Sequence, residues 1–271
     1  MLKSRFLDKG FSSSQLKILA VVCMTIDHIE YYLSGILPVP FWFGIIGRIA
    51  APLFFFCTAK GLFYTHDRIA YCRRLYIAAV LMALGNSLIN HWFHHPLGLS
   101  VNNAIFETLF YVVYFVTVLE TIRSFSSDTD TGKKTLYYSL FILPFVIGGV
   151  ESLLPNGVFL SILKIILPSP FDVEGGFLWV LFGIGLFYCM SRRHVLVRFY
   201  LAVCLLFFLL ESTMGFTIQN LIVENHQWLM LLALPFILHY NGQKGKSSKW
   251  FFYVFYPAHI YVLVVLAYYL K

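Results

Sequence analysis

Runs of about 20 apolar residues recur along this chain and restrict its fold more than any other feature of the sequence. An α-helix of that length crosses the hydrocarbon core of a bilayer and pairs its own backbone polar groups while doing so. The chain has 271 residues, of which 59% are hydrophobic and only 12% are charged, and its mean hydropathy is +0.76. These values exclude an ordinary soluble protein. The sequence predicts an all-α, polytopic membrane helical bundle, with residues 1–271 forming a single integral membrane domain.

Basic residues are concentrated between the apolar runs. The chain begins with Lys3, Arg5 and Lys9, and its formal net charge is +7. Lys and Arg in the short connections between spans are the pattern that sets membrane orientation, so the charge predicts topology and no nucleic-acid partner. We expect a cytoplasmic N-terminus, surrounding membrane lipids, and a first apolar run that is too long for a signal peptide and stays attached as the first span.

We expect about nine full spans and one short segment that does not cross. The expected spans cover residues 15–37, 41–64, 75–90, 102–122, 135–150, 175–190, 196–213, 221–240 and 249–270. Residues 65–74 and 123–134 are interpreted as cytoplasmic loops. Residues 158–167 are apolar but only about ten long, which is typical of a re-entrant or interfacial segment. Without a crossing there, the basic cluster at 191–198 falls in the cytoplasm and the C-terminus lies outside.

Ionisable residues inside the first expected span are candidates for function. Asp27 and His28 lie in an apolar run, where an acid costs about 2.5–3.5 kcal/mol to insert. Lys17 and His28 are eleven residues apart, so on a helix they lie on one stripe and about 16 Å apart along the axis. The alternative is a polar pair that only holds helices together.

Two further residues are expected to approach this stripe. Arg48, in the second expected span, needs an acidic or ligand partner, and its depth matches that of Asp27 to within about 3 Å. His259, in the last expected span, lies at a depth within about a turn of His28. We therefore predict an Asp27–Arg48 ion pair beside His28 and His259, where a neutral imidazole is suited to accept a proton. For His259 the alternative is a structural Tyr-His helix end kinked by Pro257.

Other clusters do not predict a metal centre. His91, His94 and His95 lie close together in an expected outer loop, but an interfacial belt of aromatic and histidine side chains explains them better than a metal site. The five cysteines are scattered in or beside apolar runs and form no C-x-x-C motif. We expect neither a metal site nor structural disulfides.

Three blocks of sequence resemble one known family. They are LKILA at 16–20 with MTIDH at 24–28, IGRIA at 46–50 with PLF at 52–54, and LP at 234–235, YNG at 240–242 and FFY at 251–253 with FYPAH at 255–259. In this order and spacing they resemble the TraX-like membrane proteins, whose type member acetylates the N-terminus of conjugative pilin. The family is similar to wider membrane acyltransferases that use acetyl-CoA, in which a basic residue and a histidine of the first span have the spacing of Lys17 and His28.

The resemblance implies an acetyl-CoA-dependent acyltransferase in the bacterial cytoplasmic membrane. It implies catalytic roles for His28, Asp27, Arg48 and His259, and acetyl-CoA as the acyl donor. Residues implied on the donor side, where phosphates would dock, are Lys17, Arg68, Arg73, Arg74, Tyr240, Asn241, Lys244 and Lys249. For each basic residue the alternative is membrane topology alone. The acceptor stays open between a protein N-terminal amine, such as that of a pilin, and a hydroxyl of an envelope glycan or lipid.

Two other classes of function also fit these residues. Buried His, Asp and Arg are typical of proton-coupled transporters, although no inverted repeat is evident in the sequence. A non-catalytic protein of envelope or secretion assembly is the third possibility.

Overall fold

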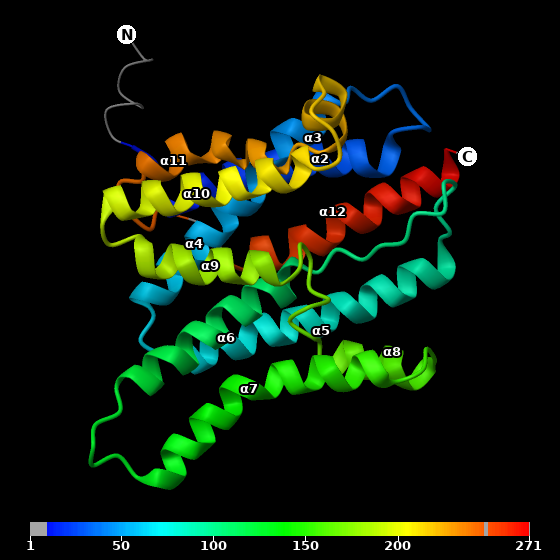
Figure 1. The fold of residues 1–271 in the computed structure, drawn as a ribbon. Coiled ribbons are helices and arrows are strands. Elements are labelled where there is room, and N and C mark those ends of the chain that lie inside the picture. Colours follow the sequence, from blue (N-terminus) through cyan, green and yellow to red (C-terminus); the bar gives the residue numbers. More distant parts are fainter. Residues whose placement is uncertain (1–9, 247–248, 271) are drawn as a thin grey trace. The chain divides into compact units, whose positions relative to one another are not determined.

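The computed structural model describes residues 10–246 and 249–270, and it is all-helical over them. Helix makes up 74% of the structure, and no strand occurs in the described residues. The elements follow one another as shown in Figure 1. They are α2 Ser13–Leu33, α3 Trp42–Gly47, α4 Ala50–Tyr64, α5 Arg68–Trp92, α6 Ile105–Arg123, α7 Thr131–Leu153, α8 Val158–Ile166, α9 Phe177–Cys189, α10 Arg193–Ser212, η1 Gln219–Glu224, η2 Gln227–Ala233, α11 Leu234–Leu238 and α12 Lys249–Tyr269.

Within the part of the chain that the structure describes, six helical segments are long and apolar enough to cross a membrane. They are Trp42–Tyr64, Arg68–Trp92, Ile105–Arg123, Thr131–Leu153, Arg193–Ser212 and Trp250–Tyr269. The expectation of a multi-pass helical protein is therefore confirmed. The remaining expected spans are a 21-residue helix α2 that carries three charged side chains, a 13-residue helix α9, and a broken segment. The count of about nine spans and the orientation stay predictions.

The expected continuous span 221–240 is wrong, because the structure interrupts it at Asn225 and His226 and changes the type of helix at Leu234. A π-helix, η1, ends at Glu224, a 3-10 helix, η2, starts at Gln227, and α11 follows from Leu234. At the break between η1 and η2, polar side chains form hydrogen bonds with one another. Asn225 Nδ2 donates to Asn220 Oδ1 at 2.5 Å.

The expected span 41–64 is interrupted as well, at Arg48 and Ile49. Pro52 has no backbone N–H, so the carbonyl of Arg48 lacks the donor that a continuous α-helix would supply four residues later. The expected loop 65–74 is helical from Arg68 onward. Asp67 explains this start, because its carboxylate accepts the backbone N–H of Ala70 at 2.7 Å, as a helix-capping residue does.

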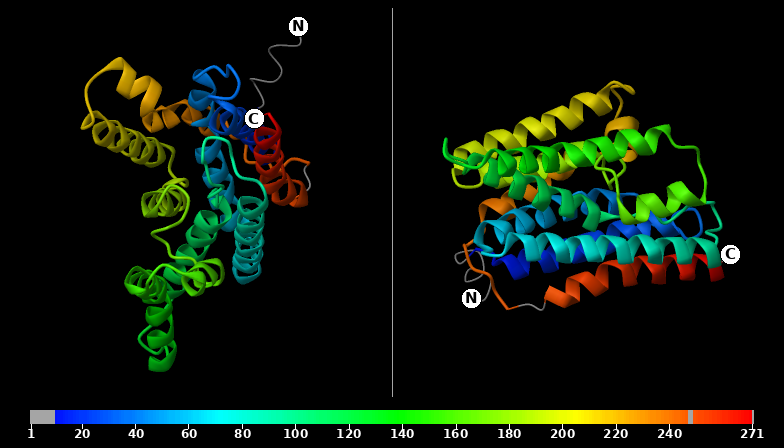
Figure 2. Two further views of the ribbon diagram at one scale, coloured as in Figure 1. Left: turned by 90° about the vertical axis from the view of Figure 1, so that its right-hand side faces the viewer. Right: turned by 90° about the horizontal axis from the view of Figure 1, so that it is seen from below.

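The chain forms two compact units, and we describe each by itself. The first comprises residues 1–57, 89–101 and 188–271. In it α2 packs against α3 and α12, drawn in blue and red in Figures 1 and 2. Ser12 and Gln15 form a capping box at the start of α2. At the other end of α2, His95 Nε2 donates to the Tyr32 carbonyl at 2.7 Å.

The second unit comprises residues 58–88 and 102–187. In it α6 packs against α7, and α7 against α8. Tyrosine hydroxyls hold the end of α8, since Tyr76 donates to the Ile166 carbonyl at 2.6 Å and Tyr111 donates to the Pro168 carbonyl. α8 has nine residues and is not among the helices long enough to cross, which agrees with a re-entrant or interfacial segment.

Candidate active site

Two histidines from α2 and α12 meet inside the first unit. His28 Nδ1 lies 2.7 Å from His259 Nε2. The two ring planes differ by 8° and the centroids are 4.9 Å apart. That centroid distance is about the nitrogen–nitrogen distance plus the two ring radii, so the rings lie nearly end to end in one plane. The contact is therefore a well-aligned hydrogen bond and not a face-to-face stack.

The hydrogen-bond partners of the two rings fix where their protons lie. His259 Nδ1 is 2.9 Å from the Phe255 carbonyl oxygen. Because a carbonyl oxygen only accepts, His259 Nδ1 carries the proton, and in the neutral ring Nε2 is the acceptor. His28 Nδ1 then donates to His259 Nε2, which puts the lone pair of His28 on its Nε2. We therefore assign His28 Nε2 as the basic atom of the pair.

Aromatic side chains surround the pair and keep it from water. His28 is 5% exposed and His259 is 8% exposed. The Phe255 ring lies parallel to the His259 ring with centroids 5.2 Å apart. Tyr32 and Tyr256 make edge contacts with His28, and both tyrosines are buried. Burial in an apolar environment favours the neutral form of an imidazole, which is the form that accepts a proton.

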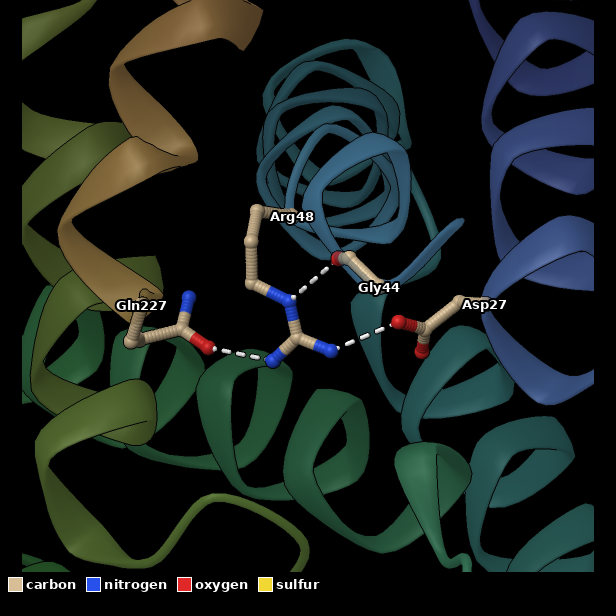
Figure 3. Close-up of polar contacts among 4 residues, drawn as sticks. All are labelled: Asp27, Gly44, Arg48 and Gln227. Atoms are coloured by element: carbon tan, nitrogen blue, oxygen red, sulfur yellow. Dashed lines mark hydrogen bonds and ion pairs between the residues drawn. The ribbon is translucent and has the colours of Figure 1, made fainter. Parts of the chain in front are cut away.

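Arg48 lies at the break between α3 and α4, and three acceptors hold its guanidinium (Figure 3). Its Nη2 donates to Asp27 Oδ1 at 2.6 Å, its Nη1 to Gln227 Oε1 at 2.9 Å, and its Nε to the Gly44 carbonyl at 3.1 Å. The predicted Asp27–Arg48 ion pair is thus present. Because Asp27 directly precedes His28 in α2, this pair orients the turn of helix that carries the imidazole.

Glycines allow the close approach of α3 to α2. A side chain at Gly47 would collide with the carboxylate and Cβ of Asp27. A Cβ at Gly44 would lie 3.1 Å from Nε2 of His226 and 3.6 Å from a carboxylate oxygen of Glu30. The Gly47-Arg48 sequence therefore supplies both the space for Asp27 and its partner.

Lys17 and His28 lie on one stripe of α2, and that stripe faces α12. Lys17 Nζ lies over the Phe252 ring at 5.4 Å from its centroid. His28 meets His259 further along the same two helices. From the first contact to the second, the residue numbers increase along both helices, so α2 and α12 run parallel here. Lys17 lies near the start of α2. A cation over an aromatic face contributes about 0.5–2 kcal/mol.

The other residues expected on the donor side have several positions. The backbone N–H of Asn241 donates to the Phe11 carbonyl at 2.9 Å, and Tyr240 pairs with Phe11 in an isolated bridge. These contacts place Tyr240 and Asn241 beside the first turn of α2. Next to them the Lys244 carbonyl accepts both the backbone N–H and the hydroxyl of Ser14. Acetyl-CoA binding by any of these residues stays a prediction.

The three arginines of the donor group lie on the first turns of α5, in the second unit. Arg68 lies over the Phe187 ring and Arg74 over the Tyr71 ring, whereas Arg73 is exposed. Lys249 begins α12, and its side chain is outside the described residues. The leader residues Lys3, Arg5 and Lys9 are also outside them.

The histidines at 91–95 do not form a cluster that could hold a metal ion, and neither does any other group in the described part of the chain. His95 is buried and accepts the Leu97 N–H at 3.2 Å while donating to Tyr32. It is a structural histidine of the loop after α5.

Sequence reasoning missed Gln227, which contacts Arg48, and Glu211, which contacts Gln227. Gln227 is a neutral amide in an apolar run and carries no charge that would single it out. Glu211 near the end of α10 is an acid in an expected span, and that signal was available. It accepts the backbone N–H of Gln227 at 2.9 Å.

Fold and site together define a polytopic, helical membrane protein with an imidazole pair and an arginine–aspartate pair inside one helical unit. A family model described as "TraX protein" matches residues 12–267, so the chain belongs to the TraX family. This confirms the resemblance that the sequence blocks indicated. No match was found among curated proteins or solved structures.

Proposed function

We propose that this protein is an integral membrane acyltransferase that moves acetyl from cytosolic acetyl-CoA to an acceptor at or beyond the outer face of a bacterial cytoplasmic membrane. The observation that carries the proposal is the buried imidazole pair, with the basic lone pair on His28 Nε2. Membership of the TraX family supports it, because that family is consistent with pilin acetylation. Acetyl-CoA is a substrate here, and the proposal needs no metal.

In the proposed reaction His28 acts as the general base. An amine or hydroxyl of the acceptor attacks the thioester carbonyl while His28 Nε2 takes its proton. The carbon–sulfur bond of the thioester breaks, and the thiolate of coenzyme A leaves and takes that proton. The balance is one acetylated acceptor and one free thiol, with no oxidant or reductant. A positioned base of this kind contributes about 10²–10⁴-fold to the rate.

The neighbours of His28 support this role electrostatically. When His28 gains a proton, its Nδ1–H bond to His259 becomes charge-assisted and therefore stronger. The Phe255 carbonyl holds His259 in the tautomer that can accept that bond. Asp27 and Arg48 keep the adjacent turn of α2 in place and supply a fixed pair of opposite charges next to the reacting group.

Lys17 is the proposed contact for the donor. It lies three turns nearer the start of α2 than His28, on the stripe that faces α12. An extended thioester arm following this stripe would bring the acetyl group from Lys17 toward His28. We expect Lys17→Ala to weaken the apparent affinity for acetyl-CoA as well as the rate.

The direct test uses purified protein in detergent or liposomes, acetyl-CoA labelled in its acetyl group, and separated envelope fractions as acceptors. The proposal expects label in an acceptor fraction, either on a protein amine or on a glycan or lipid hydroxyl. Absence of transfer to every fraction, with the protein folded and acetyl-CoA present, refutes it. The transporter alternative instead predicts proton-coupled solute flux without acetyl transfer.

A further inference from the structure

The second acceptor of the Arg48 guanidinium is itself held from elsewhere in the chain. Gln227 Oε1 accepts from Arg48 Nη1 at 2.9 Å (Figure 3). Because a guanidinium only donates, this contact also fixes which end of the Gln227 amide faces Arg48. Arg48 therefore depends on the position of Gln227 as well as on Asp27.

Gln227 is the first residue of the 3-10 helix η2, where backbone N–H groups lack partners within the helix. The residue at the capping position, His226, makes no side-chain capping bond. Glu211, near the end of α10, takes over this function. Its Oε1 accepts the backbone N–H of Gln227 at 2.9 Å across 16 residues of sequence. A carboxylate at a helix start is also favoured by the helix dipole.

The junction around Glu211 is tied together by further bonds. Asn220 Nδ2 donates to the Glu211 carbonyl at 2.9 Å, and Trp228 Nε1 donates to the Leu221 carbonyl at 2.9 Å. The Glu211 carboxylate also has a hydrogen bond from the backbone N–H of Trp228.

We infer that Glu211 is a positioning residue for Arg48. It caps η2, the cap fixes Gln227, and Gln227 holds one edge of the guanidinium while Asp27 holds the other. Removal of the Glu211 carboxylate releases the start of η2 and lets Arg48 turn away from Gln227. The positioning itself needs no catalysis, whereas its effect on acetyl transfer rests on the proposed function.

The test measures how fast Arg48 reacts with phenylglyoxal, an arginine-selective reagent, by mass spectrometry of the Arg48 peptide from the full-length protein. Glu211→Ala is expected to raise that rate by at least about threefold, because a guanidinium that loses one of its three fixed acceptors becomes more accessible. Glu211→Gln keeps an acceptor oxygen for the Gln227 N–H and should stay close to the wild type. Glu224→Gln, at an exposed carboxylate of η1, is the matched control and should not change the rate.

A second variant covers the case in which Glu211→Ala does not fold. Gln227→Met keeps the length of the side chain and the backbone N–H that Glu211 binds, but it removes the acceptor for Arg48. It must raise Arg48 labelling as well. An unchanged rate in Gln227→Met, or in a folded Glu211→Ala, overturns the inference, as does equal labelling in Glu211→Gln and Glu211→Ala.

An acetyl-transfer assay on the same variants separates this inference from the proposed function. If the wild type transfers acetyl, Glu211→Ala should lower kcat with little change in KM for acetyl-CoA, and Glu211→Gln should restore it. A wild type without any transfer refutes the proposed function, and the labelling result then still decides the role of Glu211.

Discussion

His28 Nδ1 and His259 Nε2 lie 2.7 Å apart although 231 residues separate them in the chain. The contact joins the first and last helices of the described chain, so formation of the pair requires the first unit to be complete. The chemistry proposed for His28 then depends on a helix that is synthesised after the other helices of the described chain.

Replacement of the base should separate catalysis from folding. We expect His28→Ala to bind acetyl-CoA nearly as well as the wild type and to lower the transfer rate by about 10²–10⁴-fold. His91→Ala, at an exposed histidine at the end of α5, is the matched control and should keep the wild-type rate. The measurements are equilibrium binding and single-turnover transfer of label. An undiminished rate in His28→Ala would move the role of base to His259.

The transfer rate should depend on pH through one proton. His259 Nδ1 and His28 Nδ1 each already carry a proton, so the next proton added goes to His28 Nε2 and removes the base. Activity is therefore present at higher pH and lost as the pH falls, with a limiting slope of about one in a logarithmic plot. Acetyl-CoA binding measured over the same range serves as the control. A rate that rises as the pH falls, with acetyl-CoA binding unchanged, contradicts a histidine base.

Asp27 and Arg48 should be coupled in stability. Asp27→Asn or Arg48→Gln leaves the other charge without its ion-pair partner, and each should lower stability by about 2 kcal/mol. This figure is below that of a fully buried pair, because the side chains are 18% and 27% exposed. The double variant should be milder than the sum. Thermal unfolding of the four proteins in detergent gives the cycle, and strict additivity would exclude the pairing.

Gly47 should not tolerate a side chain, whereas another helical glycine should. The Cβ in Gly47→Ala collides with Asp27, so we expect a loss of stability of about 1–3 kcal/mol together with a loss of transfer. Gly149→Ala in α7 is the control, since nothing lies within 4 Å of its added Cβ. There the better helix propensity of Ala should leave stability equal or slightly higher. Equal thermal stability of the wild type and Gly47→Ala would contradict the observed contact.

The distribution of basic residues predicts the topology. Cys72 and the loop at 123–134 should be cytoplasmic, and Lys271 should lie outside. Labelling of single-cysteine variants with an impermeant maleimide on intact cells measures this. Reaction at 72 together with protection at 271 would indicate the opposite orientation and contradict the predicted topology. Protection at both positions would indicate that residues 158–167 cross the membrane.

The sequence predicted the fold class and the paired charges because both follow from the cost of placing polar groups in a bilayer. Asp27 and Arg48 lie in apolar runs at similar depth and have opposite charges, so each is a suitable partner for the other. The approach of His28 and His259 followed from their depth. These inferences use helix geometry and charge alone.

The contacts of Gln227 with Arg48 and with Glu211 depend on tertiary structure, which a helical sequence pattern does not predict. Gln227 reaches Arg48 because the chain leaves the helical path at Asn225 and His226 and restarts as a 3-10 helix. That break is stabilised by Glu211, which comes from a different helix. Hydrophobic periodicity cannot indicate an interruption whose partner lies elsewhere in the chain.

The hydrogen bond from His259 to Phe255 is invisible to side-chain substitution, because its acceptor is a main-chain carbonyl oxygen. Substitution at position 255 replaces the aromatic ring but leaves the main-chain oxygen in place, so scanning mutagenesis along α12 would score the packing of that ring and overlook the tautomer control. An ester in place of the amide between Phe255 and Tyr256 would weaken the carbonyl as an acceptor with every side chain unchanged. Side-chain mutagenesis would therefore report only on the packing of the Phe255 ring. The backbone ester would report on which nitrogen of His259 carries the proton.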